Sequence, residues 1–240
     1  MPELDDRRTE ERRIRVAYAG RRCDDRYGWS SPAYVFMMHE VERRLLELLS
    51  RNGLSSLDGR SILEIGCGTG HWLREFVKWG ARPRDVVGMD LLADRVDAAK
   101  ARCAPGVRLF TGSAASLPLP DARFDVVAQF TVFTSILDPD LKRRVAAEMR
   151  RVAKPDGLML WYDFSFDNPG NPDVRGIRAT EIRKLFPGCS VTLRRVTLAP
   201  PVTRRVAPRS WLVCTLLDAI PLLRTHYLGL IRKREDDRQW

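Results

Sequence analysis

Short apolar runs alternate with longer amphipathic stretches along most of this chain. The first clear run covers 61–65 and is followed by 71–79, where Trp72, Phe76 and Trp79 recur at helical spacing. Further runs and amphipathic stretches follow at 85–90, 92–103, 107–113, 117–130, 138–152 and 158–164. Buried strands that alternate with helices are typical of a parallel sheet with helices on both faces. The pattern therefore predicts an α/β fold built on a doubly wound sheet.

The two ends of the chain follow a different pattern. Residues 1–14 are dense in charge, so we expect them to be disordered or loosely attached. Ser31 and Pro32 are typical first residues of a helix, which we expect to end at Gly53. Toward the C-terminus the pattern predicts a helix at 180–186, a strand at 191–198, a helix at about 210–219 and a final strand at 227–232.

Three glycines at alternate positions, Gly66, Gly68 and Gly70, separate the first strand from its helix. Glycine permits backbone dihedrals that other residues avoid and lets a ligand approach the backbone. The free N–H groups of the following helix point toward such a ligand. A dinucleotide-binding turn would have its third glycine at position 71, which is His71 here. The spacing weakens the interpretation as a pyrophosphate site and leaves a nucleotide-like ligand.

The run Glu64-x-Gly66-x-Gly68-x-Gly70 resembles the first motif of class I S-adenosylmethionine-dependent methyltransferases. The segments 85–90, 107–113, 117–127 and 154–164 resemble the strands and loops that follow it in that family, in the same order. The resemblance implies a mostly parallel, seven-stranded, Rossmann-like sheet that ends in an antiparallel hairpin. It also implies S-adenosylmethionine as the cofactor, and a helical lid ahead of the first strand. The aromatic residues of that lid would be Tyr18, Tyr27 and Trp29.

Asp90 ends the second strand, where a carboxylate can accept hydrogen bonds from both ribose hydroxyls of the cofactor. The family usually has Asp at the position of Ser113, where it reaches the adenine amino group. A serine hydroxyl can accept the same hydrogen bond. The residues that the resemblance assigns to the cofactor are Glu64, Gly66, Cys67, Gly68, Gly70, Asp90, Leu91, Ser113, Ala114, Gln129, Phe130 and Tyr27.

Methyl transfer from a sulfonium depends mainly on positioning, and it needs a base only when the acceptor is a hydroxyl or a protonated nitrogen. The candidates for such a base are His226, His39, Asp163 and Tyr27, and no spacing argument separates them. We take His226 and Asp163 as the candidate catalytic residues. The cysteines and histidines show no spacing that would indicate a metal site.

The formal net charge of +10 favours anionic partners. The positive residues are nevertheless spread through all the predicted helices, and no RNA-binding module is recognisable, so nucleic acid is the less favoured partner. The 5 cysteines are odd in number and widely spaced, which fits a reducing cytoplasm.

The chain divides into a flexible N-terminus and lid segment at 1–30 and a methyltransferase domain at 31–240, with an insertion at about 199–225. The insertion combines apolar residues, Trp211 and Leu212 among them, with flanking arginines. This composition suits peripheral contact with a membrane or the binding of a lipid-linked acceptor, and equally a structural cap on the domain.

We therefore expect a cytoplasmic methyltransferase that acts on an oxygen of a small molecule, a glycan or a lipid-linked intermediate. Residues 129–132 do not resemble the signature typical of base N-methylation. An RNA methyltransferase and a protein that binds S-adenosylmethionine without catalysis remain alternatives. A nicotinamide-dependent dehydrogenase is disfavoured by the glycine spacing. The acceptor and the oligomeric state stay open.

Overall fold

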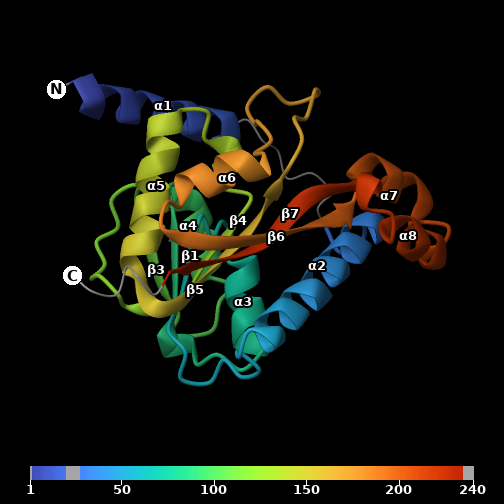
Figure 1. Ribbon diagram of the computed structural model, residues 1–240, viewed down its shortest axis with the longest axis horizontal. Coiled ribbons are helices and arrows are strands. Elements are labelled where there is room, and N and C mark those ends of the chain that lie inside the picture. The colour runs from blue at the N-terminus through green and yellow to red at the C-terminus, as the bar shows by residue number, and fades with distance from the viewer. Residues whose placement is uncertain (1, 20–27, 235–240) are drawn as a thin grey trace.

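The computed structural model describes residues 2–19 and 28–234 (Figure 1). The strands are β1 (Ile62–Ile65), β2 (Val86–Asp90), β3 (Arg108–Thr111), β4 (Phe124–Phe130), β5 (Ala153–Phe164), β6 (Cys189–Leu198) and β7 (Arg224–Lys233). Within the described residues they form a 7-stranded sheet in the order β3-β2-β1-β4-β5-β7-β6. The strands β1 to β5 pair in parallel, and β7 runs antiparallel to its neighbours β5 and β6. The predicted mostly parallel sheet with an antiparallel hairpin at its end is confirmed.

Helices cover both faces of this sheet (Figure 1). They are α1 (Pro2–Ala19), α2 (Pro32–Arg51), α3 (His71–Lys78), α4 (Ala93–Lys100), α5 (Pro139–Val152), α6 (Ala179–Leu185), α7 (Pro200–Val206) and α8 (Trp211–Asp218), with the short 3-10 helices η2 (Pro83–Asp85), η3 (Phe133–Ser135) and η4 (Pro221–Leu223). Successive residues of a strand point to opposite faces. Leu63 and Ile65 of β1 therefore pack with α5 and α6, and Ile62 packs with α2 and α3. Burial on both faces explains why the central strands read as continuous apolar runs.

Capping residues set the beginnings of two helices as predicted. The hydroxyl of Ser31 accepts a hydrogen bond from the amide of Tyr34 at the start of α2. The carboxylate of Asp138 accepts one from the amide of Asp140 at the start of α5. A proline follows each cap, in the turn where a helix has no partner for its N–H groups.

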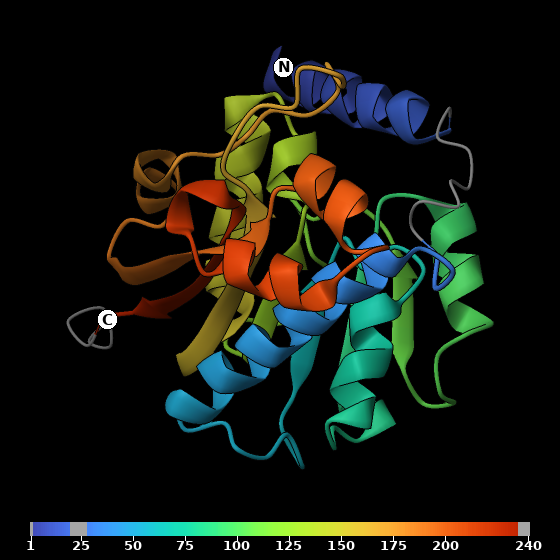
Figure 2. The same ribbon diagram turned by 90° about the vertical axis from the view of Figure 1, so that its right-hand side faces the viewer.

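The N-terminal segment differs from the expectation of disorder at residues 1–14. Residues from Pro2 onward form α1, which lies across the carboxyl ends of the strands (Figure 2). The carboxylate of Glu10 accepts hydrogen bonds from the amide of Leu137 at 2.6 Å and from that of Asp138 at 3.4 Å. Arg13 pairs with Glu10 and donates to the carbonyl oxygen of Ser135 at 2.6 Å. Charges that the sequence analysis took as a sign of disorder thus hold this helix on the domain.

The insertion also contains more structure than the sequence predicts, because α7 precedes the expected helix. Pro200 and Pro201 occupy the first turn of α7, where a missing N–H leaves nothing unpaired. The two helices lie beside α2 (Figure 2) and form a small core with its residues Ala33 and Phe36. In the part of the chain that the structure describes, no helix combines the length and the hydropathy needed to cross a bilayer.

Candidate active site

The glycine turn lies at the carboxyl end of β1, where the chain enters α3. Gly66, Gly68 and Gly70 have φ angles of 66°, 51° and 77°, in the left-handed region that favours glycine. A Cβ on Gly66 would lie 2.3 Å from Cγ2 of Val132, and one on Gly70 would lie 2.6 Å from Sγ of Cys103. The turn therefore requires glycine for its conformation and for its packing.

Asp90 lies at the end of β2, beside this turn. Its carboxylate accepts hydrogen bonds from the amide of Gly68 at 2.8 Å and from the amide of Leu92 at 2.9 Å. Burial raises the pKa of this carboxyl above its usual value, and the two amide donors oppose the rise. Each carboxylate oxygen can accept a further bond. Asp90 is thus held in position with capacity left for the hydroxyl groups of a ligand.

A pocket opens beside Asp90, between the carboxyl ends of the strands and α1. The predicted cofactor residues that line it are Gly66, Asp90, Leu91, Ser113, Ala114 and Phe130. The lining does not include Glu64, Cys67, Gly68, Gly70 or Gln129, and Tyr27 lies outside the described residues. Apolar side chains from the loop after β4 and from α5 complete the wall: Val132, Ile136, Leu141 and Val145. Loops that follow neighbouring parallel strands meet here, as expected at this edge of an open α/β sheet.

Glu64 is buried within β1 and has an incomplete set of hydrogen bonds. Its Oε2 has no hydrogen-bond partner among the described residues. Burial, and then the nearby charge of Asp90, raise the pKa of the Glu64 carboxyl well above its usual value. A buried carboxyl oxygen without a partner is costly unless a ligand or a water molecule supplies a donor. Glu64 therefore fits a role toward a cofactor bound on the glycine turn.

Gln129 and Thr131 shape the turn that follows β4. The Oε1 atom of Gln129, which is fully buried, accepts a hydrogen bond from the amide of Val132 at 3.0 Å. Thr131 has a φ of 59°, which is strained for a β-branched residue. Strain of this kind costs roughly 1–3 kcal/mol and often occurs at functional sites. Gln129 supports the pocket from behind, and Thr131 and Val132 line it.

Helix α1 covers the pocket and contributes Glu11, Ile14 and Tyr18 to its lining. Tyr18 belongs to the aromatic residues expected in a lid, and its hydroxyl lies 2.7 Å from Oγ of Ser135. Glu11 and Ile14 fall in the stretch that the sequence analysis expected to be disordered. Their spacing with Tyr18 places all three on one helical face, which was the available signal in the sequence.

The loop after β3 receives a carboxylate from this helix. Oγ of Ser113 donates a hydrogen bond to Oε1 of Glu11. The resemblance to the family implies a carboxylate at the position of Ser113 itself, whereas here a helix distant in sequence supplies one. Glu11 was therefore missed because it belongs to another element.

The two candidate catalytic residues, His226 and Asp163, lie outside the pocket lining and are almost completely buried. In the register of β5 and β7, Asp163 pairs with Tyr227 and Phe164 pairs with His226. Because neighbours along a strand point to opposite faces, the side chains of Asp163 and His226 do so too. The fold brings both residues to the strand ends but does not bring them together.

The environments of these two side chains differ in kind. His226 stacks on Tyr162 with ring centroids 4.8 Å apart, and burial lowers its pKa to about 3. Asp163 accepts hydrogen bonds from the hydroxyl and the amide of Thr134, and burial raises its pKa to about 6. His39, another candidate base, is exposed on α2 with its ring 5.9 Å from that of Trp211. Nδ1 of His226 lies 3.1 Å from Oγ1 of Thr225, and the lowered pKa leaves this ring neutral at neutral pH.

Comparison with known proteins agrees with this arrangement. Residues 62–157, from β1 into β5, match the family model described as a methyltransferase domain. A probable S-adenosylmethionine-dependent methyltransferase of Mycolicibacterium smegmatis is 31% identical over 167 residues, which are 66% of this chain and 60% of that protein. The malonyl-(acyl-carrier protein) O-methyltransferase of Serratia marcescens is 33% identical over 132 residues, which are 55% of this chain and 47% of that protein.

The crystal structure of a SAM-dependent methyltransferase from Archaeoglobus fulgidus shares the fold, with a TM-score of 0.55 and 16% identity, covering 83% of this chain and 100% of that one. The chain spans 60% and 47% of the lengths of the two curated relatives. The matched segment contains the glycine turn, Asp90 and the turn after β4, which build the pocket together with α1. Residues 62–157 therefore match a methyltransferase domain, and the chain has the fold of the S-adenosylmethionine-dependent methyltransferases to which it is similar.

Proposed function

We propose that this protein transfers a methyl group from S-adenosylmethionine to an oxygen of a small molecule, a glycan or a lipid-linked intermediate. The observation that carries the proposal is Asp90, which lines the pocket and is held by the amides of Gly68 and Leu92 with acceptor capacity to spare. A carboxylate at this position suits the two ribose hydroxyls of the cofactor. The match of residues 62–157 to a methyltransferase domain supports the reaction class.

The residues present fit this cofactor along the whole pocket. Leu91 and Ala114 line the pocket together with Asp90 and Ser113 and can offer apolar contacts to adenine. Glu64, with its unpartnered Oε2, would accept a hydrogen bond from the amino group of the methionine part. When bound, the cofactor supplies an electrophilic methyl group on a sulfonium. The protein's part is to hold the acceptor in line with that methyl group and to exclude water, a task for which α1 is placed.

Two observations support oxygen as the acceptor atom. The related protein of Serratia marcescens is named as an O-methyltransferase. The turn after β4, residues 129–132, uses a buried glutamine and a strained threonine where enzymes that methylate base amines typically have a proline-rich signature.

Calorimetric titration of the protein with S-adenosylmethionine and S-adenosylhomocysteine tests the proposal. We expect micromolar dissociation constants, which correspond to binding free energies on the order of −8 kcal/mol. Asp90→Ala should weaken binding at least 100-fold because it removes the hydrogen-bond acceptor for the ribose. Asp97→Ala, which removes an exposed carboxylate of α4, is the matched control and should bind like the wild type. Release of S-adenosylhomocysteine with a panel of hydroxyl and carboxyl acceptors then separates an enzyme from a protein that only binds the cofactor. Absence of binding to both ligands would refute the proposal.

For a hydroxyl acceptor we further propose His226 as the general base, a role that requires the acceptor to reach its buried ring beside Tyr162, outside the pocket lining. With such an acceptor, His226→Asn should lower kcat on the order of 100-fold or more and leave the affinity for S-adenosylhomocysteine unchanged. His39→Asn makes the same replacement at an exposed position and should change neither. A kcat of His226→Asn within twofold of the wild type would exclude this role.

A further inference from the structure

Helix α8 of the insertion directs most of its apolar side chains to solvent. Leu212 and Leu216, one turn apart, are 69% and 62% exposed. Leu222, in η4, is 82% exposed. A helix that packs on a core normally turns its apolar stripe inward. We use the name docking face for the exposed apolar residues 211, 212, 213, 216, 220 and 222 together with Arg204, Arg205 and Arg209.

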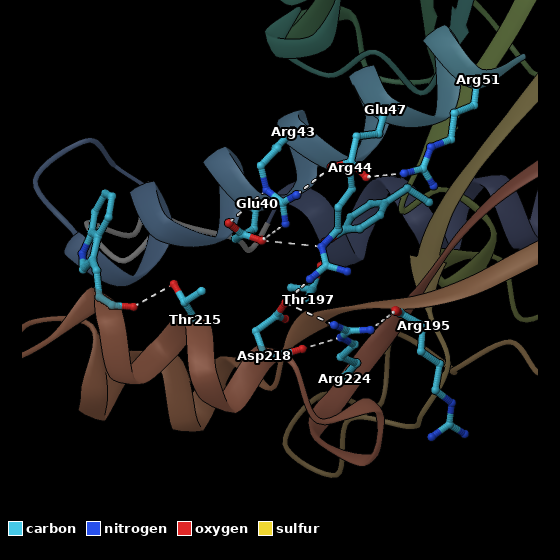
Figure 3. A network of polar contacts seen from close by, with 12 residues as sticks. Glu40, Arg43, Arg44, Glu47, Arg51, Arg195, Thr197, Thr215, Asp218 and Arg224 are labelled. Atoms are coloured by element: carbon cyan, nitrogen blue, oxygen red, sulfur yellow. Dashed lines mark hydrogen bonds and ion pairs between the residues drawn. The ribbon is translucent and has the colours of Figure 1, made fainter.

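The inward side of α8 is held largely by charged groups. Asp218 is buried and forms ion pairs with Arg44 of α2 and with Arg224 at the start of β7 (Figure 3). The Nε–H of Arg224 also donates to the carbonyl oxygen of Asp218. Cys214, one turn earlier, packs into the small core that contains Phe36. These contacts fix the rotation of the helix, so its leucines are held outward by the fold itself.

The exposed charges of the segment 199–223 are all positive. Arg204, Arg205 and Arg209 are exposed on and just after α7. The only carboxylate in this stretch of sequence is Asp218, which is already buried and paired. The insertion therefore presents apolar surface and uncompensated positive charge together.

The insertion leaves the sheet at the same edge as the pocket. Leu198 at the end of β6 pairs with Arg224 at the start of β7, and His226 pairs with Phe164 at the carboxyl end of β5. Figure 1 shows α7 and α8 at one end of the molecule, away from α1. A surface that binds α8 would therefore lie close to the carboxyl ends of the strands, where the loops of the pocket are. Such a surface would leave α1 uncovered.

We propose that the docking face binds the surface of an anionic lipid bilayer. Trp211 and the exposed leucines would enter the boundary between headgroups and acyl chains, and the three arginines would lie among the headgroups. An amphipathic element of this kind lies in the interface and does not cross it. The single sign of the exposed charges is the reason to prefer a bilayer to a protein partner. The proposal concerns the surface by which the protein binds a membrane. It does not depend on whether the protein transfers a methyl group.

Flotation of the full-length protein with lipid vesicles tests this proposal. The probes are vesicles of phosphatidylcholine alone and vesicles of phosphatidylcholine and phosphatidylglycerol in equal amounts. We expect the protein to float with the anionic vesicles, and less so as salt rises because exposed charges are screened. Leu212→Ser/Leu216→Ser should weaken partitioning on the order of 100-fold, since it removes two side chains that would be buried in lipid.

Removal of the arginines tests the electrostatic part separately. Each arginine near an anionic surface contributes about fivefold, so Arg204→Gln/Arg205→Gln/Arg209→Gln should cost about 100-fold. The matched control, Arg84→Gln/Arg102→Gln/Arg108→Gln, removes the same charge near β2 and β3 at the other side of the sheet, where all three arginines are exposed. Phe110→Ser, at an exposed position of β3, is the control for the apolar pair.

The outcomes separate the proposal from its competitors. Retention of binding by both controls, with loss in both docking-face variants whose thermal unfolding matches the wild type, supports a bilayer contact. Equal loss in the arginine control would show that net charge alone drives binding and would overturn the assigned surface. Absence of binding to any vesicle would overturn the proposal, as would a protein dimer that the leucine variant dissociates in the absence of lipid.

Discussion

Asp163 is a carboxylate enclosed at the carboxyl end of β5 with no exposed surface. Oδ1 accepts hydrogen bonds from the hydroxyl of Thr134 at 2.6 Å and from the amide of Phe164 at 2.9 Å. Burial nevertheless dominates and raises its pKa from the usual 3.8 to about 6. The folded chain therefore binds a proton at Asp163 more tightly than the unfolded chain does.

This residue makes the stability of the protein depend on pH in a defined direction. A carboxyl whose pKa is raised by folding stabilises the fold below the unfolded value, and this contribution is lost as pH rises through the folded pKa. The interval from 3.8 to about 6 corresponds to about 3 kcal/mol in the free energy of unfolding. Between pH 4 and pH 7, which covers most of this interval, the wild type should therefore lose roughly 2 kcal/mol relative to Asp163→Asn, by urea unfolding. A difference between the two proteins that stays constant across this range would contradict the prediction.

Among the elements, α1 combines two tasks. Glu10 and Arg13 attach it to the backbone around the start of α5, and Glu11, on the adjoining face, reaches the loop after β3. If Glu11 replaces the carboxylate that relatives carry at the position of Ser113, the lid itself takes part in recognising adenine. One helix, α1, would then both cover the pocket and recognise adenine.

The substitution Glu11→Gln tests this double role. It keeps the size of the side chain and an acceptor for Ser113, but it removes the negative charge that would hold the adenine amino group. We expect the affinity for S-adenosylhomocysteine to fall about tenfold, or about 1.4 kcal/mol, in calorimetric titration. Glu47→Gln on the exposed side of α2 is the control. An unchanged dissociation constant for Glu11→Gln would assign recognition of adenine to Ser113 alone.

The elements also show what could be predicted from sequence and what could not. The strands and the helices after each of them follow from local periodicity, and Ser31 and Asp138 mark helix starts by local capping. The attachment of α1 could not be predicted, because Glu10 bonds to the amide of Leu137, far along the chain. The charge density of residues 1–14 indicated disorder because the groups that pair with these charges are backbone groups of distant loops. The local sequence pattern does not identify such partners.

For the molecule as a whole, the glycine turn was predictable because its backbone demands that residue type. The positive φ angles of Gly66 and Gly68 are such demands. The arrangement of the candidate catalytic residues was not predictable in this way. Whether His226 and Asp163 face each other depends on the register between β5 and β7, which only the assembled sheet determines. Sequence alone could place both at the strand ends but could not assign either to a face.

The pairing of Leu198 with Arg224 determines how freely the insertion between β6 and β7 can vary. The amide of Ala199 donates to the carbonyl oxygen of Leu223 at 2.8 Å, so the two ends of the insertion already lie as close as the ends of a tight hairpin. Segments of very different length can join β6 to β7 at this point without altering the register of either strand. The segment that joins the strands of the last hairpin can therefore change in length and composition, and with it the surface of the insertion, without altering the sheet or the glycine turn.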